Sequence, residues 1–151
     1  MARAASELTA HLGYWLRFVS NHVSLAFARK LESRGVTVAE WVVLRELYGS
    51  APVAPSEVAE RLGLTRGAIT KLADRLIAKS LLVRRASLAD GRAQRLALTA
   101  QGRLIVPGLA ALADQNDAEF FASLTAKERS DMERMLRDIV ARHGLKALPM
   151  T

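Results

Sequence analysis

Apolar residues recur every three or four positions along most of the chain, a spacing that predicts a mainly helical protein. The first such segment runs from about Ser6 to Leu31 and stops before Gly35, so it predicts one long helix. A second helix is expected to begin at Thr37, because Thr37 and Glu40 have the spacing of a capping box. Its apolar pattern continues to Gly49.

The centre of the sequence predicts two short helices joined by a tight turn. The first covers 56–62 and stops at Gly63, which suits a left-handed position after a helix end. Thr65 can cap the second helix, whose apolar residues form one buried stripe. The opposite face turns outward a polar and basic set: Arg66, Gly67, Thr70, Lys71, Asp74 and Arg75.

A β-hairpin is predicted directly afterwards, since two short runs, 81–85 and 95–99, flank a turn-prone Ala-Asp-Gly-Arg segment. Thr99 can cap a further long helix, in which Pro107-Gly108 predicts a kink or a break. Thr125 and Glu128 form a second capping box that opens the last helix. The predicted order is helix, helix, helix-turn-helix, hairpin, helix, helix.

A chain of 151 residues with 50% apolar residues predicts a single domain that can bury a core, here 6–143. The absence of cysteine excludes thiolate nucleophiles, disulfides and iron–sulfur ligation. The three histidines, His11, His22 and His143, form no cluster with carboxylates, so no metal site is expected. No apolar run approaches a membrane span and the N-terminus has no signal-like segment, so we expect a cytoplasmic protein without membrane contact.

The formal net charge of +7 is concentrated in one stretch of the sequence. The window from Arg61 to Arg95 has nine cations and two anions, and the remainder of the chain is balanced. Such a block predicts a surface that binds a polyanion, although a solubilising face has the same signature. All eight aromatic residues lie outside the window, which favours duplex over single-stranded nucleic acid, because single strands are usually held by stacking on aromatic rings.

The helix-turn-helix followed by a basic hairpin indicates a specific way of binding duplex DNA. The second helix would enter the major groove, where Arg66 and Lys71 could read guanine edges and Thr70 a base. Thr65 and Arg84 are candidates for phosphate contacts, and Arg92 in the hairpin turn for the minor groove. Asp90 is expected to orient an arginine. The full candidate DNA-binding set is Thr65, Arg66, Gly67, Thr70, Lys71, Arg75, Arg84, Arg85, Asp90 and Arg92.

The segment from Ser56 to Gly102 resembles the MarR (multiple antibiotic resistance regulator) family of winged-helix transcription factors. It reads SEVAERLGLTRGAITKLADRLIAKSLLVRRASLADGRAQRLALTAQG and is similar to the family's helix-turn-helix, its Asp-Arg-Arg wing and its Leu-Thr-x-x-Gly helix opening. Two positions depart from the pattern: Gly91 replaces the first wing arginine, and Ser80 stands where the family usually has glycine.

The resemblance implies a mainly α fold with a small β-hairpin wing. It assigns 37–99 to a winged helix-turn-helix, with the helix-turn-helix at about 55–79 and the wing at about 82–99. Segments 6–32 and 100–143 would be dimerisation helices. The residues point the same way, because these outer helices contain more large apolar side chains than a small winged domain can cover.

The family resemblance further implies a homodimer on a pseudo-palindromic operator, often a repressor released by a small aromatic or phenolic ligand. The proposed effector pocket comprises His11, Trp15, Arg17, Phe18, His22, Trp41 and Tyr48. For any single one of these residues, ordinary core and dimer packing is the favoured explanation. Arg17 could pair with a ligand carboxylate there.

No phosphate-binding glycine loop, nucleophile elbow or His-Glu-x-x-His pattern appears, so neither an enzyme nor a cofactor is expected. The alternative hypothesis is a helical interaction or small-molecule-binding protein whose winged segment has lost DNA binding.

Overall fold

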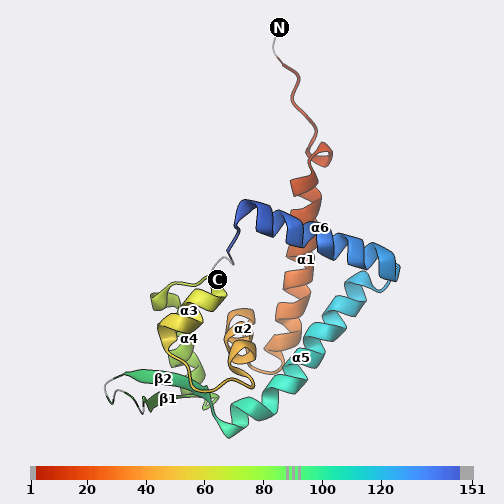
Figure 1. The fold of residues 1–151 in the computed structure, drawn as a ribbon. Helices are drawn as coiled ribbons and strands as arrows, with labels where there is room; N and C mark the ends of the chain where they lie inside the picture. The colour runs from red at the N-terminus through yellow and green to blue at the C-terminus, as the bar shows by residue number, and fades with distance from the viewer. Residues whose placement is uncertain (1–2, 88, 90, 92, 147–151) are drawn as a thin grey trace.

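The computed structural model describes residues 3–87, 89, 91 and 93–146. Within these residues the chain forms a short 3-10 helix, six α-helices and one two-stranded hairpin (Figure 1). The mainly helical fold with a small hairpin is therefore confirmed. The elements in chain order are η1 (Leu8–Ala10), α1 (Leu12–Glu32), α2 (Val38–Leu47), α3 (Pro55–Leu62), α4 (Arg66–Ala78), β1 (Leu82–Ala86), β2 (Gln94–Leu98), α5 (Ala100–Phe121) and α6 (Ala126–His143).

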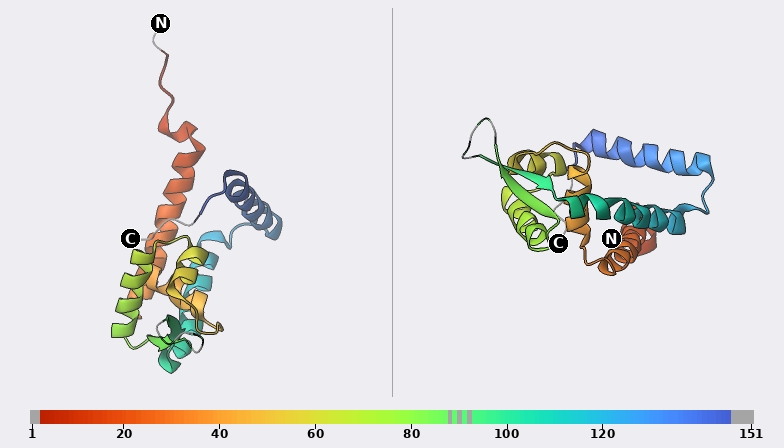
Figure 2. Two further views of the ribbon diagram at one scale, coloured as in Figure 1. Left: turned by 60° about the vertical axis from the view of Figure 1, so that its left-hand side comes forward. Right: turned by 90° about the horizontal axis from the view of Figure 1, so that it is seen from below.

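The hydrophobic core lies where α2, α3, α4 and the hairpin meet the lower parts of α1 and α5 (Figures 1 and 2). The strands pair antiparallel from Leu82 opposite Leu98 to Ala86 opposite Gln94. Leu96 of β2 is fully buried and also exchanges backbone hydrogen bonds with Val53, which fastens the hairpin to the segment before α3. The hairpin and the helix-turn-helix therefore share one core and keep a fixed relative position.

The helix starts follow the predicted caps. Thr37 and Thr125 each accept a hydrogen bond from a glutamate N–H three residues later, and each glutamate carboxylate accepts from the threonine N–H in return. Thr65 and Thr99 cap α4 and α5 through their hydroxyl oxygens. The first helix begins later than predicted, because His11 is extended and separates η1 from α1.

Four helices end with the same backbone closure. The left-handed residue is Gly35 after α1, Gly63 after α3 and Gly144 after α6. At α4 this residue is Ser80, with φ 61°, while its N–H donates to the carbonyl of Ile77 and the next N–H donates to that of Leu76. These are the two hydrogen bonds of a Schellman motif, which normally favours glycine. The serine therefore occupies a strained backbone position at the end of α4.

Of the kink or break expected at Pro107-Gly108, the break is absent, and α5 runs as one helix from Ala100 to Phe121. A proline removes one intrahelical donor, but its neighbours can keep the helix aligned when packing holds them. Val106 and Leu109 on either side of the pair are almost fully buried in the core, which explains the uninterrupted helix.

The upper half of α1 and all of α6 project away from this core (Figures 1 and 2). No described residue of α6 is buried. The two helices expose large apolar side chains, namely Leu12, Trp15, Leu16, Phe18 and Val19 on α1 and Met132, Met135, Leu136, Ile139 and Val140 on α6. Exposed apolar surface of this extent marks an interaction surface in soluble proteins.

Candidate nucleic-acid interface and adjoining cavity

Helix α4 presents two different flanks to its surroundings. Its buried stripe, Ile69, Leu72, Ala73 and Leu76, faces the core and fixes the rotation of the helix. Arg66 and Thr70 lie on one flank, where they line a shallow hollow together with Gln94 of β2. Lys71 and Arg75 lie on the other flank and line a larger cavity. The outward residues predicted as one DNA-facing set therefore face two different neighbouring surfaces.

Ion pairs divide the basic residues of this region into neutralised and unneutralised groups. Arg84 pairs with Asp74 of α4 at 2.7 Å, and Arg61 pairs with Glu57 at 2.7 Å. Within the described part of the chain, no ion pair involves the following cations: Arg66, Lys71, Arg75, Arg85 and Arg95. Their charge is available to a polyanion, whereas a phosphate would have to compete with Asp74 for Arg84.

The hairpin places directly opposite each other two cations that form no ion pair with any described residue. Arg85 of β1 and Arg95 of β2 are register partners, so their side chains lie on the same face of the hairpin. Like charges in this arrangement repel each other, and a bound polyanion would relieve the repulsion. Arg95 was not among the predicted contacts, although its alternation with buried Leu96 could have placed it on the outer face. Asp90 and Arg92 lie outside the described residues.

A buried carboxylate connects the end of α4 to the start of α2. Glu40 is only 1% exposed, and the Lys79 ammonium donates to both of its oxygens, at 2.9 and 2.7 Å. Lys79 also donates to the carbonyl of Gly35, between α1 and α2. Burial would raise the pKa of Glu40, but hydrogen bonds from Lys79 and Thr37 hold this pKa below its ordinary value of 4.5. The sequence indicated only the capping role of Glu40, because its partner is 39 positions away.

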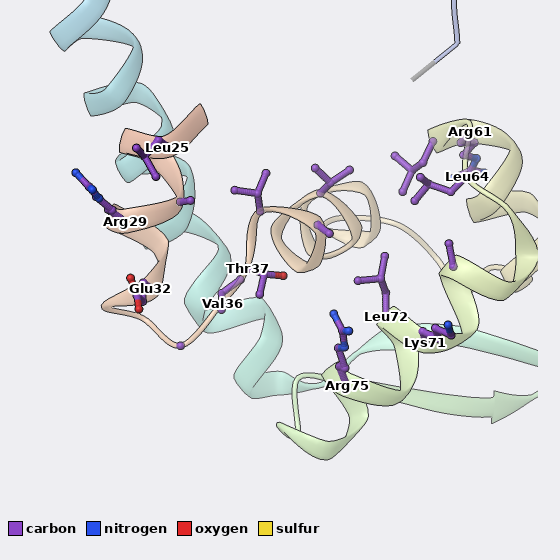
Figure 3. Close-up of a pocket in the computed structure, with 17 residues that line it drawn as sticks. Leu25, Arg29, Glu32, Val36, Thr37, Arg61, Leu64, Lys71, Leu72 and Arg75 are labelled. Carbon is purple, nitrogen blue, oxygen red and sulfur yellow. The ribbon is translucent and has the colours of Figure 1, made fainter. Parts of the chain in front are cut away.

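A cavity of about 980 Å³ lies between α1, α2 and the helix-turn-helix (Figure 3). Its apolar wall includes Leu25 and Val36 as well as side chains of α2, α3 and α4. Charged side chains at its border are Arg29, Glu32, Arg61, Lys71 and Arg75. Because Arg61 is paired with Glu57, the described residues around the cavity include three cations without an ion pair and one carboxylate, so the cavity combines an apolar wall with a positive rim.

The residues predicted as an effector pocket lie elsewhere, and none of them lines this cavity. On α1, Phe18 stacks on His22 with ring centroids 5.0 Å apart, and the Trp15 indole N–H donates to the carbonyl of Thr9. His11 and Arg17 are exposed. On α2, half-buried Trp41 packs edge-on against Phe27, and Tyr48, directly after α2, lies beneath the Arg45 guanidinium. The effector-pocket set stays a prediction.

Two kinds of feature are absent from the described residues. None of the described helices has the length and apolarity needed to cross a membrane. Among the same residues there is no group of three or more histidine, aspartate or glutamate side chains that could hold a metal ion.

The sequence of the chain is similar to those of known proteins. Residues 34–93 match the family model described as MarR family. The chain is 31% identical over 130 residues to an HTH-type transcriptional repressor of Mycobacterium tuberculosis, covering 86% of this chain and 94% of the relative. It is 29% identical over 126 residues to the HTH-type transcriptional repressor MdtR of Bacillus subtilis, covering 83% and 81%.

Solved structures agree over most of the chain. A mutant MarR from E. coli complexed with operator DNA superimposes with a TM-score of 0.77 at 26% identity, covering 85% of this chain and 93% of that one. CouR from Rhodococcus jostii bound to p-coumaroyl-CoA gives 0.77 at 26%, covering 89% and 95%. The PcaV transcriptional regulator from Streptomyces coelicolor, in complex with its natural ligand, gives 0.78 at 27%, covering 92% and 98%.

Proposed function

Because the chain belongs to the MarR family of transcriptional regulators, we propose that it is a dimeric repressor that binds a pseudo-palindromic duplex operator and releases it when a small organic anion binds. The observation that supports DNA binding most directly is the set of unpaired cations on α4 and the adjacent hairpin. The relative from E. coli that superimposes on this chain was solved with operator DNA.

In this proposal α4 enters the major groove with its N-terminal end foremost. Arg66 reads a guanine edge, and exposed Thr70 on the same flank contacts a neighbouring base or a thymine methyl. The backbone at Gly67 approaches the duplex closely. Thr65, at the positive end of the helix dipole, donates its hydroxyl to a phosphate in this proposal.

The remaining cations hold the phosphate backbone. Lys71 and Arg75 bind phosphates from the far flank of α4, and Arg85 and Arg84 bind them from the hairpin, where Arg84 must exchange Asp74 for a phosphate. Arg92, which lies between the two strands in the sequence, is assigned to the minor groove, and Asp90 is assigned to orient an arginine.

Dimerisation is supported by the apolar surfaces of α1 and α6. A second copy would bury them by isologous packing and bring two α4 helices to half-sites about 34 Å apart. Ligand response is supported by the cavity between α1 and α4, whose volume and apolar wall suit a small organic molecule. CouR and PcaV, which share this fold, were both solved with ligands.

Operator selection from a random duplex pool tests the proposal. The parent protein should enrich one palindromic sequence, and Arg66→Ala and Arg92→Ala should each weaken binding to it. Lys127→Ala, an exposed position on α6, is the control for a lost surface charge. If no palindrome emerges and both arginine variants bind duplex as well as the parent does, the alternative hypothesis of a helical interaction or small-molecule-binding protein replaces this one.

The oligomeric state is tested separately by light scattering across a dilution series. Replacing Leu136 on α6 by glutamate places a charge in the proposed interface and should shift the mass toward the monomer. The same mass for the parent and the variant at every concentration would refute α6 as part of the interface.

A further inference from the structure

The cavity and the proposed DNA-binding face share two cations. Lys71 and Arg75 belong to the outward residues of α4, yet both also line the cavity on the side of α1. Figure 3 shows the Arg75 side chain rising from α4 into the space that faces Thr37. Arg66 and Thr70 do not take part, because they lie on the opposite flank beside β2.

The chemistry of the cavity selects one class of occupant. Val36 and Leu72 are almost completely buried and line the cavity together with half-exposed Leu25, which favours an apolar body. Arg29, Lys71 and Arg75 make no ion pair with any described residue, and their only opposing charge at the border is Glu32. A molecule with an apolar body and one or more negative groups is complementary to this arrangement.

We propose that an organic anion in this cavity competes with duplex DNA for Lys71 and Arg75, so that release of the duplex follows from neutralisation of one flank of α4. This inference rests on the proposed function, and it adds that ligand and phosphate use the same two side chains. The ligand then acts on phosphate contacts, which every duplex offers, and leaves the base-reading flank at Arg66 unchanged.

The shared cations should change the salt dependence of duplex binding by an amount that can be calculated. Each neutralised phosphate contributes about 0.9 to the slope of log affinity against log salt concentration. Two shared cations in each chain make four in a dimer, so saturating ligand should reduce the slope by up to about 3.6. At moderate salt this corresponds to a loss of duplex affinity of tenfold or more. By thermodynamic linkage, the duplex must lower the affinity for the ligand by the same factor.

The experiment measures duplex binding by fluorescence anisotropy on a random-sequence duplex of about 30 base pairs, which offers phosphates without an operator. The probes are benzoate, 2-naphthoate and 4-biphenylcarboxylate, each paired with its neutral amide. At least one carboxylate is expected to lower duplex affinity tenfold or more and to flatten the salt dependence, whereas its amide has less than a twofold effect.

Two variants separate shared cations from other mechanisms. In the double variant Lys71→Gln/Arg75→Gln, the carboxylate effect should fall below twofold. In Arg66→Gln, the matched control on the other flank, the carboxylate should still lower random-duplex affinity by the parent's factor. Val42→Phe, which narrows the cavity from α2, should weaken carboxylate binding in calorimetry and reduce the effect. Circular dichroism melting confirms that each variant is folded.

Several results would overturn the inference. One is a carboxylate that binds in calorimetry but leaves random-duplex affinity unchanged, because ligand and phosphate then use separate side chains. Another is an effect on the selected operator alone, which indicates a change of half-site geometry. A third is the absence of binding by all three carboxylates at millimolar concentration. Failure of the proposed function itself looks different, because the protein would then not bind duplex in the absence of any acid.

Discussion

Replacing Gly102 by alanine should disrupt the junction between α4, the hairpin and α5. A Cβ at this position would lie 2.2 Å from the carbonyl oxygen of Leu81 and 3.2 Å from its carbonyl carbon. The same oxygen accepts a hydrogen bond from the backbone N–H of Thr99 at 3.1 Å. Since the obstacle is backbone, it cannot move aside as the end of a side chain would. The contact must open by about 1.2 Å to reach an ordinary van der Waals distance of 3.4 Å.

The expected cost follows from these contacts. Overpacking of a rigid site costs about 1–3 kcal/mol, and loss of the Thr99 hydrogen bond adds about 1 kcal/mol. The better helix propensity of alanine returns somewhat less than about 1 kcal/mol, so the net loss of unfolding free energy should be about 2 kcal/mol. With an m-value of about 2 kcal/mol per molar urea, the unfolding midpoint should fall by about 1 M.

The assay is urea unfolding followed by circular dichroism at one fixed protein concentration, because dimer formation would make stability depend on concentration. Gly108→Ala is the matched control in the same helix. Its new Cβ would meet only the guanidinium end of Arg34, at 3.2 Å, and that flexible group can move away. The control should leave the midpoint unchanged or raise it. Equal midpoints for Gly102→Ala and Gly108→Ala would refute the reasoning.

Three further predictions concern α4 and its surroundings. Ser80→Gly should raise the unfolding free energy by about 1 kcal/mol, because glycine adopts the left-handed position without strain; an unchanged urea midpoint would contradict this. Gly67→Ala should raise the unfolding free energy by about 0.5 kcal/mol, since its Cβ meets nothing within 4 Å. The same variant should lower duplex affinity in anisotropy, and unchanged affinity would contradict the proposed close approach of DNA at Gly67. Because the pKa of Glu40 is lower in the folded state, its stabilisation is present above about pH 4.5 and disappears as the pH falls further. Glu40→Gln should therefore be less stable than the parent in urea unfolding at pH 7, and the difference should shrink below pH 4.5; a constant difference at all pH values would refute the assignment.

Local spacing explains why so much of the fold could be predicted from the sequence. A capping box involves residues three apart, so Thr37 and Thr125 marked the starts of α2 and α6 correctly. The core stripe of α4 follows from helical periodicity in the same way. Of the kink or break predicted at Pro107, the break is absent, because the packing of Val106 and Leu109 that keeps α5 continuous depends on residues distant in sequence.

Less of the candidate site could be predicted from the sequence, for a related reason. The outward face of α4 was visible in the sequence, but its division into two flanks depends on what packs beside it. The Lys79–Glu40 pair and the contribution of Arg29 to the cavity arise from segments that meet only in the folded chain. Arg84 illustrates the same limit, since its neutralisation by Asp74 requires the hairpin to lie against α4.

The open apolar faces of α1 and α6 also determine how the protein would respond to its own abundance. One chain presents a single α4, so reading a palindrome requires two chains to meet first. Where unpaired chains predominate, the concentration of the operator-binding species rises with the square of the chain concentration. Diluting the chains twofold, as in one cell division without synthesis, would then lower that species by about fourfold. The packing of two helices would thus set a threshold for repression that the DNA contacts alone cannot provide.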